Sequence, residues 1–332
     1  MARVTPFIRD ELLPPRRPPR RHLLSIADLA REDVERLLAL SRQFARSLDR
    51  DVKKLPTLRG RTVVNLFYEA STRTSSSFEL AAKRLSADVM SIKSVGSSVD
   101  KGESLKDTAL TLAAYDPDVI VVRHPEIGAP NLVAQHTAAH IVNAGDGQHQ
   151  HPTQALLDLY TIEEELGGVA GIRVAIVGDV LHSRVARSNI QAFLLMGAHV
   201  TLVGPPTLIP RGIERMGCDV AHDIGAIAAA DVVYVLRMQR ERMREGESYV
   251  PSLREYSARW GVTAARLRPG QKVMHPGPMN RGVEIEAAVA DAADALIERQ
   301  VRSGLVVRMA VLYDLLTYDP AEVHAATRQE VA

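Results

Sequence analysis

Short apolar runs alternate along the chain with segments in which apolar residues recur at helical spacing. The runs are rich in valine and isoleucine and do not alternate strictly between apolar and polar residues, which indicates strands covered by helices on both faces. The expected strands are 62–67, 88–92, 118–122 and 139–142 in one sheet, and 173–178, 199–203, 231–236 and 272–274 in a second. This order predicts an α/β fold of repeated βαβ units with parallel sheets.

A chain of 332 residues with 46% hydrophobic content is longer than one ordinary domain. We expect two doubly wound parallel-sheet domains, 22–151 and 152–294, with the active site in the cleft between them. A helix over 152–166 should bridge them, because Pro152 is tolerated in a first turn and Gly167 stops the helix. A terminal helix at about 295–317, with a break considered at Gly304, is expected to pack back on the first domain.

Residues 1–21 are expected to form a flexible N-terminal extension. The segment 13–21 consists almost wholly of proline and arginine. The extension has no apolar stretch long enough for a secretory signal, and Asp10 and Glu11 argue against a transit peptide, which is poor in acidic residues. A contact with a partner subunit is the alternative role.

The overall charge provides no field that would attract a polyanion. Lys and Arg number 41 against 40 Asp and Glu, the net charge is +1, and aromatic residues make up only 4%. These values argue against nucleic acid or membrane as a partner, and no apolar run approaches the roughly 18–20 residues that span a bilayer. The single cysteine, Cys218, excludes an internal disulfide, suits a cytoplasmic location and is expected to be a small buried apolar residue.

The most informative segment lies where an expected strand is followed by a helix. Residues 69–78 read Glu-Ala-Ser-Thr-Arg-Thr-Ser-Ser-Ser-Phe, and apolar residues continue from Phe78 at helical spacing. Backbone N–H groups at a helix N-terminus lack partners and the helix dipole favours an anion, while Arg73 carries a planar fork that matches phosphate oxygens. The segment predicts a phosphate pocket, with an ordinary Ser- and Thr-rich helix cap as the alternative.

Five further polar clusters lie at expected strand ends or in loops. They are 97–103, Arg123-His124-Pro125, His-Pro-Thr-Gln at 151–154, Arg184, and Arg237-Met238-Gln239. Each alone is a weak signal, since an arginine past a strand is more often solvated than bound to a ligand. Together with residues 69–78 they favour one site for phosphate and carboxylate groups between the two sheets.

Three motifs carry a family resemblance: Ser-Thr-Arg-Thr at 71–74, Asn-Ala-Gly-Asp-Gly at 143–147 with His-Pro-Thr-Gln at 151–154, and His-Pro-Gly-Pro at 275–278. Through them the chain resembles the catalytic chains of aspartate carbamoyltransferases, in the aspartate/ornithine carbamoyltransferase superfamily, over about residues 22–317. The resemblance implies transfer of the carbamoyl group of carbamoyl phosphate to the amine of L-aspartate, an early step of de novo pyrimidine biosynthesis, without cofactor or metal. It also implies that 22–151 bind carbamoyl phosphate and 152–294 bind aspartate.

The resemblance implies a carbamoyl-phosphate site that includes Ser71, Thr72, Arg73, Thr74, Ser97, Arg123, His151, Gln154, Pro276, Gly277 and Pro278. The 71–74 motif would hold the phosphate. Arg123 and His151, with Thr74, would bind the carbonyl oxygen. Gln154, with the backbone carbonyls at 276 and 277, would hold the carbamoyl amine.

The same resemblance assigns aspartate to Lys101, Arg184, Arg237 and Gln239. The arginines would clamp its two carboxylates, with Gln239 assisting, and Ser97 and Lys101 would enter from the neighbouring subunit of a homotrimer. The implied catalytic residues are Arg73, Thr74, Lys101, Arg123, His151 and Gln154. A regulatory chain or a dihydroorotase-type protein is a further candidate partner.

The residue types fit this reaction. The amine of aspartate attacks the carbamoyl carbon, negative charge develops on the carbamoyl oxygen, and phosphate leaves. Donors fixed around that oxygen stabilise the transition state more than the ground state. No nucleophilic side chain is required, because the two substrates are held together.

An ornithine or other amino-acid carbamoyltransferase is the nearest alternative. Ornithine ends in a cation, which a second arginine would repel, and its family carries a His-Cys-Leu-Pro loop where this chain has His-Pro-Gly-Pro. Gly277 departs from the leucine that is frequent in the aspartate enzymes, which leaves the rigidity of this loop open. A non-catalytic scaffold homologue would be expected to lack some of the site's charged residues or its histidine, and none is missing.

Three readings from other classes have weaker support. Gly178 follows an expected strand, but the Gly-x-Gly-x-x-Gly fingerprint of a dinucleotide site is missing. His149 and His151 lack a third ligand cluster for a metal-dependent hydrolase. The arginines of 237–244 interleave with glutamates, which favours a mixed-charge mobile loop over a nucleic-acid patch.

Overall fold

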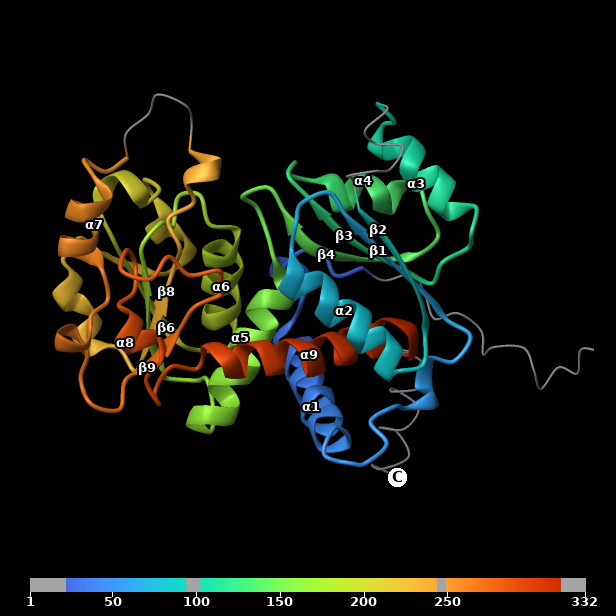
Figure 1. The fold of residues 1–332 in the computed structure, drawn as a ribbon, viewed down its shortest axis with the longest axis horizontal. Coiled ribbons are helices and arrows are strands. Elements are labelled where there is room, and N and C mark those ends of the chain that lie inside the picture. Colours follow the sequence, from blue (N-terminus) through green and yellow to red (C-terminus); the bar gives the residue numbers. More distant parts are fainter. Residues whose placement is uncertain (1–21, 94–101, 244–248, 318–332) are drawn as a thin grey trace, which may run out of the picture.

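The computed structural model describes residues 22–93, 102–243 and 249–317, which form two parallel sheets (Figure 1). The first sheet has the order β2-β1-β3-β4, with β1 (Thr62–Phe67), β2 (Asp88–Lys93), β3 (Val119–His124) and β4 (His140–Asp146). The second has the order β7-β6-β5-β8-β9, with β5 (Arg173–Val177), β6 (His199–Val203), β7 (Asp219–Ala221), β8 (Val232–Val235) and β9 (Lys272–Met274). All these strands pair in parallel, so the prediction of two parallel α/β sheets is confirmed.

Helices pack against the sheets and against one another. They are α1 (Arg31–Ser47), α2 (Thr72–Arg84), α3 (Leu105–Ala113), α4 (Ala129–Gln135), α5 (Pro152–Leu166), α6 (Arg184–Leu195), α7 (Leu253–Trp260), α8 (Ala287–Ala290) and α9 (Ile297–Thr317). Helix α2 contacts β1 and β2, α4 contacts β3 and β4, and α6 contacts β6. Helix α5 has the predicted bounds and contacts both β4 and α6, so it lies between the two sheets.

Two strands differ from those expected from the sequence. The residues Asn-Ala-Gly-Asp at 143–146 suggest a turn, yet they continue β4, and Asn143 is buried beside Val122 of β3. Turn-forming residues thus occupy a strand because pairing with β3 outweighs their local preference. Strand β7 was not predicted, since it has only three residues at the edge of the sheet and an exposed Asp219.

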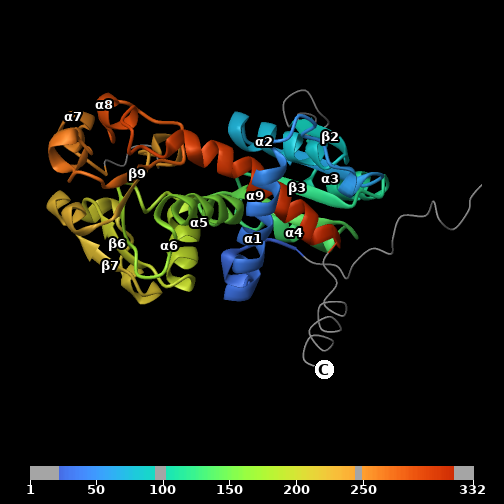
Figure 2. The same cartoon turned by 90° about the horizontal axis from the view of Figure 1, so that it is seen from below.

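The terminal helix α9 is continuous through Gly304, so the break considered there was wrong. Helix α9 packs on α1, α2 and α5, and Figure 2 shows it crossing α1. A Cβ at position 304 would lie 2.6 Å from Arg308 Nη1 and 3.3 Å from Leu157 Cδ2. Glycine therefore permits a close approach of α9 to α5, which offsets its poor helix propensity of about 1 kcal/mol.

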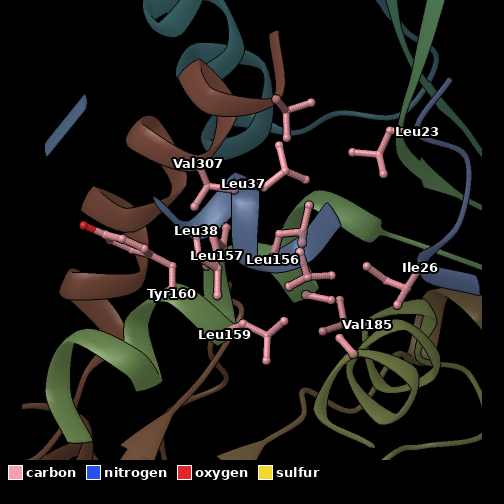
Figure 3. Close-up of a cluster of buried hydrophobic side chains, with 14 of the residues drawn as sticks. Leu23, Ile26, Leu37, Leu38, Leu156, Leu157, Leu159, Tyr160, Val185 and Val307 are labelled. Atoms are coloured by element: carbon pink, nitrogen blue, oxygen red, sulfur yellow. The ribbon is translucent and has the colours of Figure 1, made fainter. Parts of the chain in front are cut away.

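One apolar cluster extends from the first sheet to the second. It includes Val63 of β1 and Ile176 of β5. Between the sheets it is filled by Leu37 of α1, Leu156 of α5 and Val307 of α9 (Figure 3). Because both sheets share this close-packed core, their relative position is set by packing, and with it the place where their strand ends meet.

The described ranges hold no helix that is long and apolar enough to cross a membrane. In the same ranges no group of three or more His, Cys, Asp or Glu side chains could hold a metal ion. Cys218 is buried, as predicted.

Candidate active site

The carboxyl ends of strands from both sheets border one cavity of about 640 Å³. Its wall includes these residues of the predicted site: Ser71, Thr72, Arg73, Thr74, Arg123, His151, Gln154, Arg184, Arg237, Gln239, Pro276, Gly277 and Pro278. The other two predicted residues, Ser97 and Lys101, lie outside the described residues. The fold thus brings together segments from positions 71 to 278, while the role of each side chain in binding stays a prediction.

The N-terminus of α2 forms one side of the cavity. Ser71 caps this helix, and its Oγ accepts a hydrogen bond from the N–H of Thr74 at 3.4 Å. Residues 69–78 were interpreted either as a phosphate pocket or as an ordinary helix cap. The two interpretations are compatible, because the residue that caps the helix also lines the cavity. The dipole of the 13-residue helix favours an anion at this end.

Six arginines line the cavity: Arg73, Arg123, Arg184, Arg237, Arg242 and Arg308. Among the described residues of the wall, none is acidic. Burial and the neighbouring Arg184 guanidinium lower the pKa of Arg123 to about 9, and burial lowers the pKa of Arg308 to about 10. Both side chains remain protonated at neutral pH, so the cavity suits a ligand, or a pair of ligands, with several negative charges.

Glu69, just after β1, balances part of this positive charge. Its Oε2 lies 2.6 Å from Arg184 Nη2 and 3.4 Å from Arg123 Nε, and its Oε1 lies 3.5 Å from Arg242 Nη2. Arg123 Nη1 also donates to the backbone oxygen of Ala144 at 3.2 Å. Since Arg184 begins α6, its pair with Glu69 joins the two sheets at the cavity and fixes the direction of the guanidinium groups.

His151 stands at the N-cap of α5 and is buried. Its backbone N–H donates to Ser188 Oγ at 2.8 Å, which ties it to α6. Burial, with the charges of Arg123 and Arg184, holds the pKa of the ring well below its usual value. The imidazole is therefore neutral at physiological pH and can donate one hydrogen bond without carrying charge.

Gln154 and the loop at 275–278 are connected through buried hydrogen bonds. Gln154 Nε2 donates to Asp158 Oδ1 at 3.1 Å, and Gln300 Nε2 donates to the same oxygen at 2.7 Å. Gln300 Oε1 accepts from the N–H of His275 at 2.9 Å. His275 Nδ1 in turn accepts from the N–H of Gly277 at 2.8 Å. The loop is thereby held to both α5 and α9.

Gly277 brings this loop close to Arg73. The residue has φ +62°, and a Cβ built on it would lie 2.5 Å from Arg73 Nη1. A larger residue would be strained at this φ and would displace the guanidinium. Only the position of the Arg73 guanidinium, at the end of a flexible side chain, would have to change to admit a larger residue here.

Two domain models of one protein family match the two halves of the chain. The model of the aspartate/ornithine carbamoyltransferase carbamoyl-P binding domain matches residues 21–164, and that of the Asp/Orn binding domain matches 170–315. The chain belongs to the aspartate/ornithine carbamoyltransferase family. The two domain models of this family meet near the end of α5, the helix that lies between the sheets.

Several members of the carbamoyltransferase family are similar over nearly their full length. The aspartate carbamoyltransferase catalytic subunit of Acidothermus cellulolyticus is 58% identical over 300 residues, or 89% of this chain and 92% of the relative. That of Mycobacterium tuberculosis is 54% identical over 306 residues, or 89% and 95%. Among solved structures, the aspartate transcarbamoylase of Trypanosoma cruzi in complex with carbamoyl phosphate and aspartate has a TM-score of 0.81 at 34% identity, covering 90% of this chain and 97% of that chain.

Four charged or amide residues that line the cavity of this carbamoyltransferase family member, or pair with its arginines, were not predicted as site residues from the sequence: Glu69, Arg242, Gln300 and Arg308. Arg242 belongs to the segment for which a mixed-charge mobile loop was predicted, and its side chain is mostly buried and pairs with Glu69. Arg308 Nη1 donates to Ser77 Oγ at 2.6 Å. A signal for Arg308 was available, since a single arginine between Val307 and Met309 in an apolar helix indicates a buried partner.

The buried Asp158 should make stability depend on pH. Burial raises the pKa of its carboxyl from 3.8 to about 6, so the folded chain binds this proton more tightly than the unfolded chain. Between about pH 4 and pH 6, its contribution to the free energy of unfolding should therefore fall as pH rises, by about 3 kcal/mol in all. Urea unfolding of the wild type and Asp158→Asn, compared from pH 4 to pH 7.5, measures this difference. A difference that does not change with pH would contradict the prediction.

Proposed function

We propose that this chain is an aspartate carbamoyltransferase, which converts carbamoyl phosphate and L-aspartate to N-carbamoyl-L-aspartate and phosphate in pyrimidine biosynthesis. The observation that carries the proposal is the convergence of arginines from both sheets on one cavity at the N-terminus of α2. Such a cavity can hold a phosphate dianion and a dicarboxylate side by side. The names of the relatives and the substrates in the Trypanosoma cruzi complex support this assignment.

The phosphate of carbamoyl phosphate would bind at the N-terminus of α2. The hydroxyls of Ser71, Thr72 and Thr74 and the helix N–H groups offer donors there, and Arg73 adds a charged fork. The bond from phosphate to the carbamoyl carbon breaks in the reaction, so phosphate gains charge as it leaves. The same donors therefore bind the substrate and stabilise the leaving group.

Arg123 and His151 would act on the carbamoyl oxygen. As the aspartate amine attacks, negative charge develops on this oxygen, and a fixed cation beside a neutral donor stabilises it in a site shielded from water. Because the His151 ring is buried and neutral, it serves as a hydrogen-bond donor rather than as a base. The departing phosphate takes the proton from the attacking amine, so no side-chain base is required.

Arg184 and Arg237 would clamp the two carboxylates of aspartate, with Gln239 beside them. Arg237 pairs with the carboxylate of Glu241, so a substrate carboxylate would displace or share this partner. Ornithine carries an ammonium group at its far end, and the acidic side chains beside the described wall, Glu69 and Glu241, are already paired with its arginines. The charge of the wall therefore favours aspartate over ornithine.

The complete site would belong to a homotrimer in the cytoplasm. Ser97 and Lys101 would come from a neighbouring subunit, as the family resemblance implies, and Lys101 would add a further cation to the site. The isolated subunit would then be nearly inactive. A regulatory chain or a dihydroorotase-type partner could bind this trimer.

An assay of both acceptors tests the proposed function. Purified protein is supplied with carbamoyl phosphate and with aspartate or ornithine, and the carbamoylated product is measured while sedimentation reports the oligomer. We expect carbamoyl-aspartate as the product and a trimer as the active species. Turnover of ornithine at an equal or higher rate, or no turnover of either acceptor, would refute the assignment.

Arg237→Ala should weaken the binding of aspartate selectively. Losing a charge-assisted contact costs about 1.5–3 kcal/mol, so the KM for aspartate should rise about 10- to 150-fold while that for carbamoyl phosphate changes little. Arg259→Ala is a matched control, because the Arg259 side chain is 71% exposed on helix α7 and also pairs with a glutamate. An equal rise in the KM for both substrates in Arg237→Ala would count against the proposed role of Arg237 in binding aspartate.

A further inference from the structure

Asp158 is fully buried one helical turn beyond Gln154 on α5. Each of its two carboxylate oxygens accepts hydrogen bonds from a different pair of side chains. Oδ1 accepts from Gln154 Nε2 at 3.1 Å and from Gln300 Nε2 at 2.7 Å. Oδ2 accepts from Asn189 Nδ2 at 2.9 Å and from the Tyr234 hydroxyl at 2.7 Å. One carboxylate thus binds side chains from α5, α6, β8 and α9.

The carboxylate determines which way the two glutamine amides face. An ionised carboxylate only accepts hydrogen bonds, so Gln154 and Gln300 must both turn their NH₂ groups toward Asp158. Gln300 then has Oε1 available for the N–H of His275, the first residue of the 275–278 loop. The Gln154 amide is held in the same way, so its Oε1 is turned away from Asp158 and is available as an acceptor for a ligand in the cavity that Gln154 lines.

We propose that Asp158 is a positioning residue for recognition of the carbamoyl amine: by fixing the Gln154 amide and, through Gln300, the 275–278 loop, it directs acceptors toward that end of the substrate. This inference rests on the proposed function. A free glutamine amide could reverse and present its own NH₂ group to the carbamoyl NH₂, where two donors would face each other. Asp158 removes that alternative and so favours ligands with an N–H group over ligands with a methyl group of similar size.

Acetyl phosphate is the probe for this selection, because a methyl group replaces the carbamoyl amine while the phosphate and carbonyl are kept. The measured quantity is the ratio of its inhibition constant, in competition with carbamoyl phosphate, to the KM for carbamoyl phosphate. A merely structural change would weaken the binding of acetyl phosphate and of carbamoyl phosphate alike, and would leave this ratio unchanged. The ratio therefore reports on orientation of the acceptors rather than on general damage.

Asp158→Leu removes the acceptor while keeping the number and branching of the side-chain heavy atoms. We expect the KM for carbamoyl phosphate to rise about tenfold to hundredfold, with the inhibition constant of acetyl phosphate changed less than about threefold. If leucine prevents folding, Asp158→Ser replaces it, since its shorter hydroxyl cannot reach both glutamines. Tyr234→Phe is the matched control, because it removes a buried donor to Oδ2 and leaves both glutamine bonds intact.

Asp158→Asn separates hydrogen bonding from charge. Asn189 now donates to Oδ2 through Nδ2, and its Oδ1 is buried without a hydrogen-bond partner in the described structure. Its amide can therefore reverse and accept from the new NH₂ group, while the new amide oxygen still accepts from both glutamines. We expect this variant to keep the wild-type ratio within about threefold. A ratio as low as that of Asp158→Leu, or a wild-type ratio in a folded Asp158→Leu or Asp158→Ser protein, would overturn the inference. Wild-type protein without carbamoyl transfer to aspartate would instead refute the proposed function.

Discussion

Arg123→Leu should lower kcat about 10²- to 10³-fold, because the variant loses a fixed cation where charge develops on the carbamoyl oxygen. The side chain is aimed by its contacts with Glu69 and the oxygen of Ala144, so its position is set before substrate binds. Steady-state kinetics with both substrates saturating measure the effect. The KM values should change less than kcat, since the interaction strengthens in the transition state.

The stability of Arg123→Leu distinguishes catalysis from folding. Burial and the nearby guanidinium of Arg184 disfavour the charge of Arg123, which is why its pKa falls to about 9. Removing this charge should leave the melting temperature nearly unchanged, because Glu69 keeps its pair with Arg184. Arg123→Lys keeps the charge but loses the planar fork, so we expect an intermediate kcat. A kcat within tenfold of the wild type in Arg123→Leu would contradict the assigned role.

Arg73→Ala should lower kcat/KM for carbamoyl phosphate by about 10²- to 10³-fold, while the KM for aspartate stays within about threefold. The guanidinium lies against Gly277 at the N-terminus of α2, where the phosphate would bind and leave. The variant loses both a binding contact and stabilisation of the departing phosphate. Initial rates with each substrate varied in turn separate this result from the selective effect expected for Arg237→Ala.

Lys83→Ala is the control for Arg73→Ala. Lys83 is a cation in the last turn of the same helix, its side chain is 59% exposed, and it pairs with Glu79 on the surface. A surface pair of this kind contributes about 0–1 kcal/mol, so neither KM nor kcat should change appreciably. If Arg73→Ala weakens the binding of aspartate as much as the binding of carbamoyl phosphate, the proposed role of Arg73 in phosphate binding is wrong.

Elements set by neighbouring residues were predicted well. Helix α5 begins and ends where Pro152 and Gly167 indicate, because first-turn and C-cap preferences act over a few residues. The buried strands were found because runs of β-branched residues mark a sheet covered on both faces. The predictions failed where contacts with other elements determine where an element ends. Examples are β4, which continues beside β3, and α9, which continues through Gly304.

The sequence alone determined the fold class and the family motifs, and it indicated arginines at strand ends as candidates for phosphate and carboxylate groups, since these features depend on local pattern and residue chemistry. Only the tertiary structure decided which charges oppose one another and which amides are held in place. Glu69 meets Arg184 across 115 residues, and Gln300 meets Asp158 across 142. Such contacts leave no local trace, because the direction of a buried hydrogen bond is set by the partner that packing brings to it.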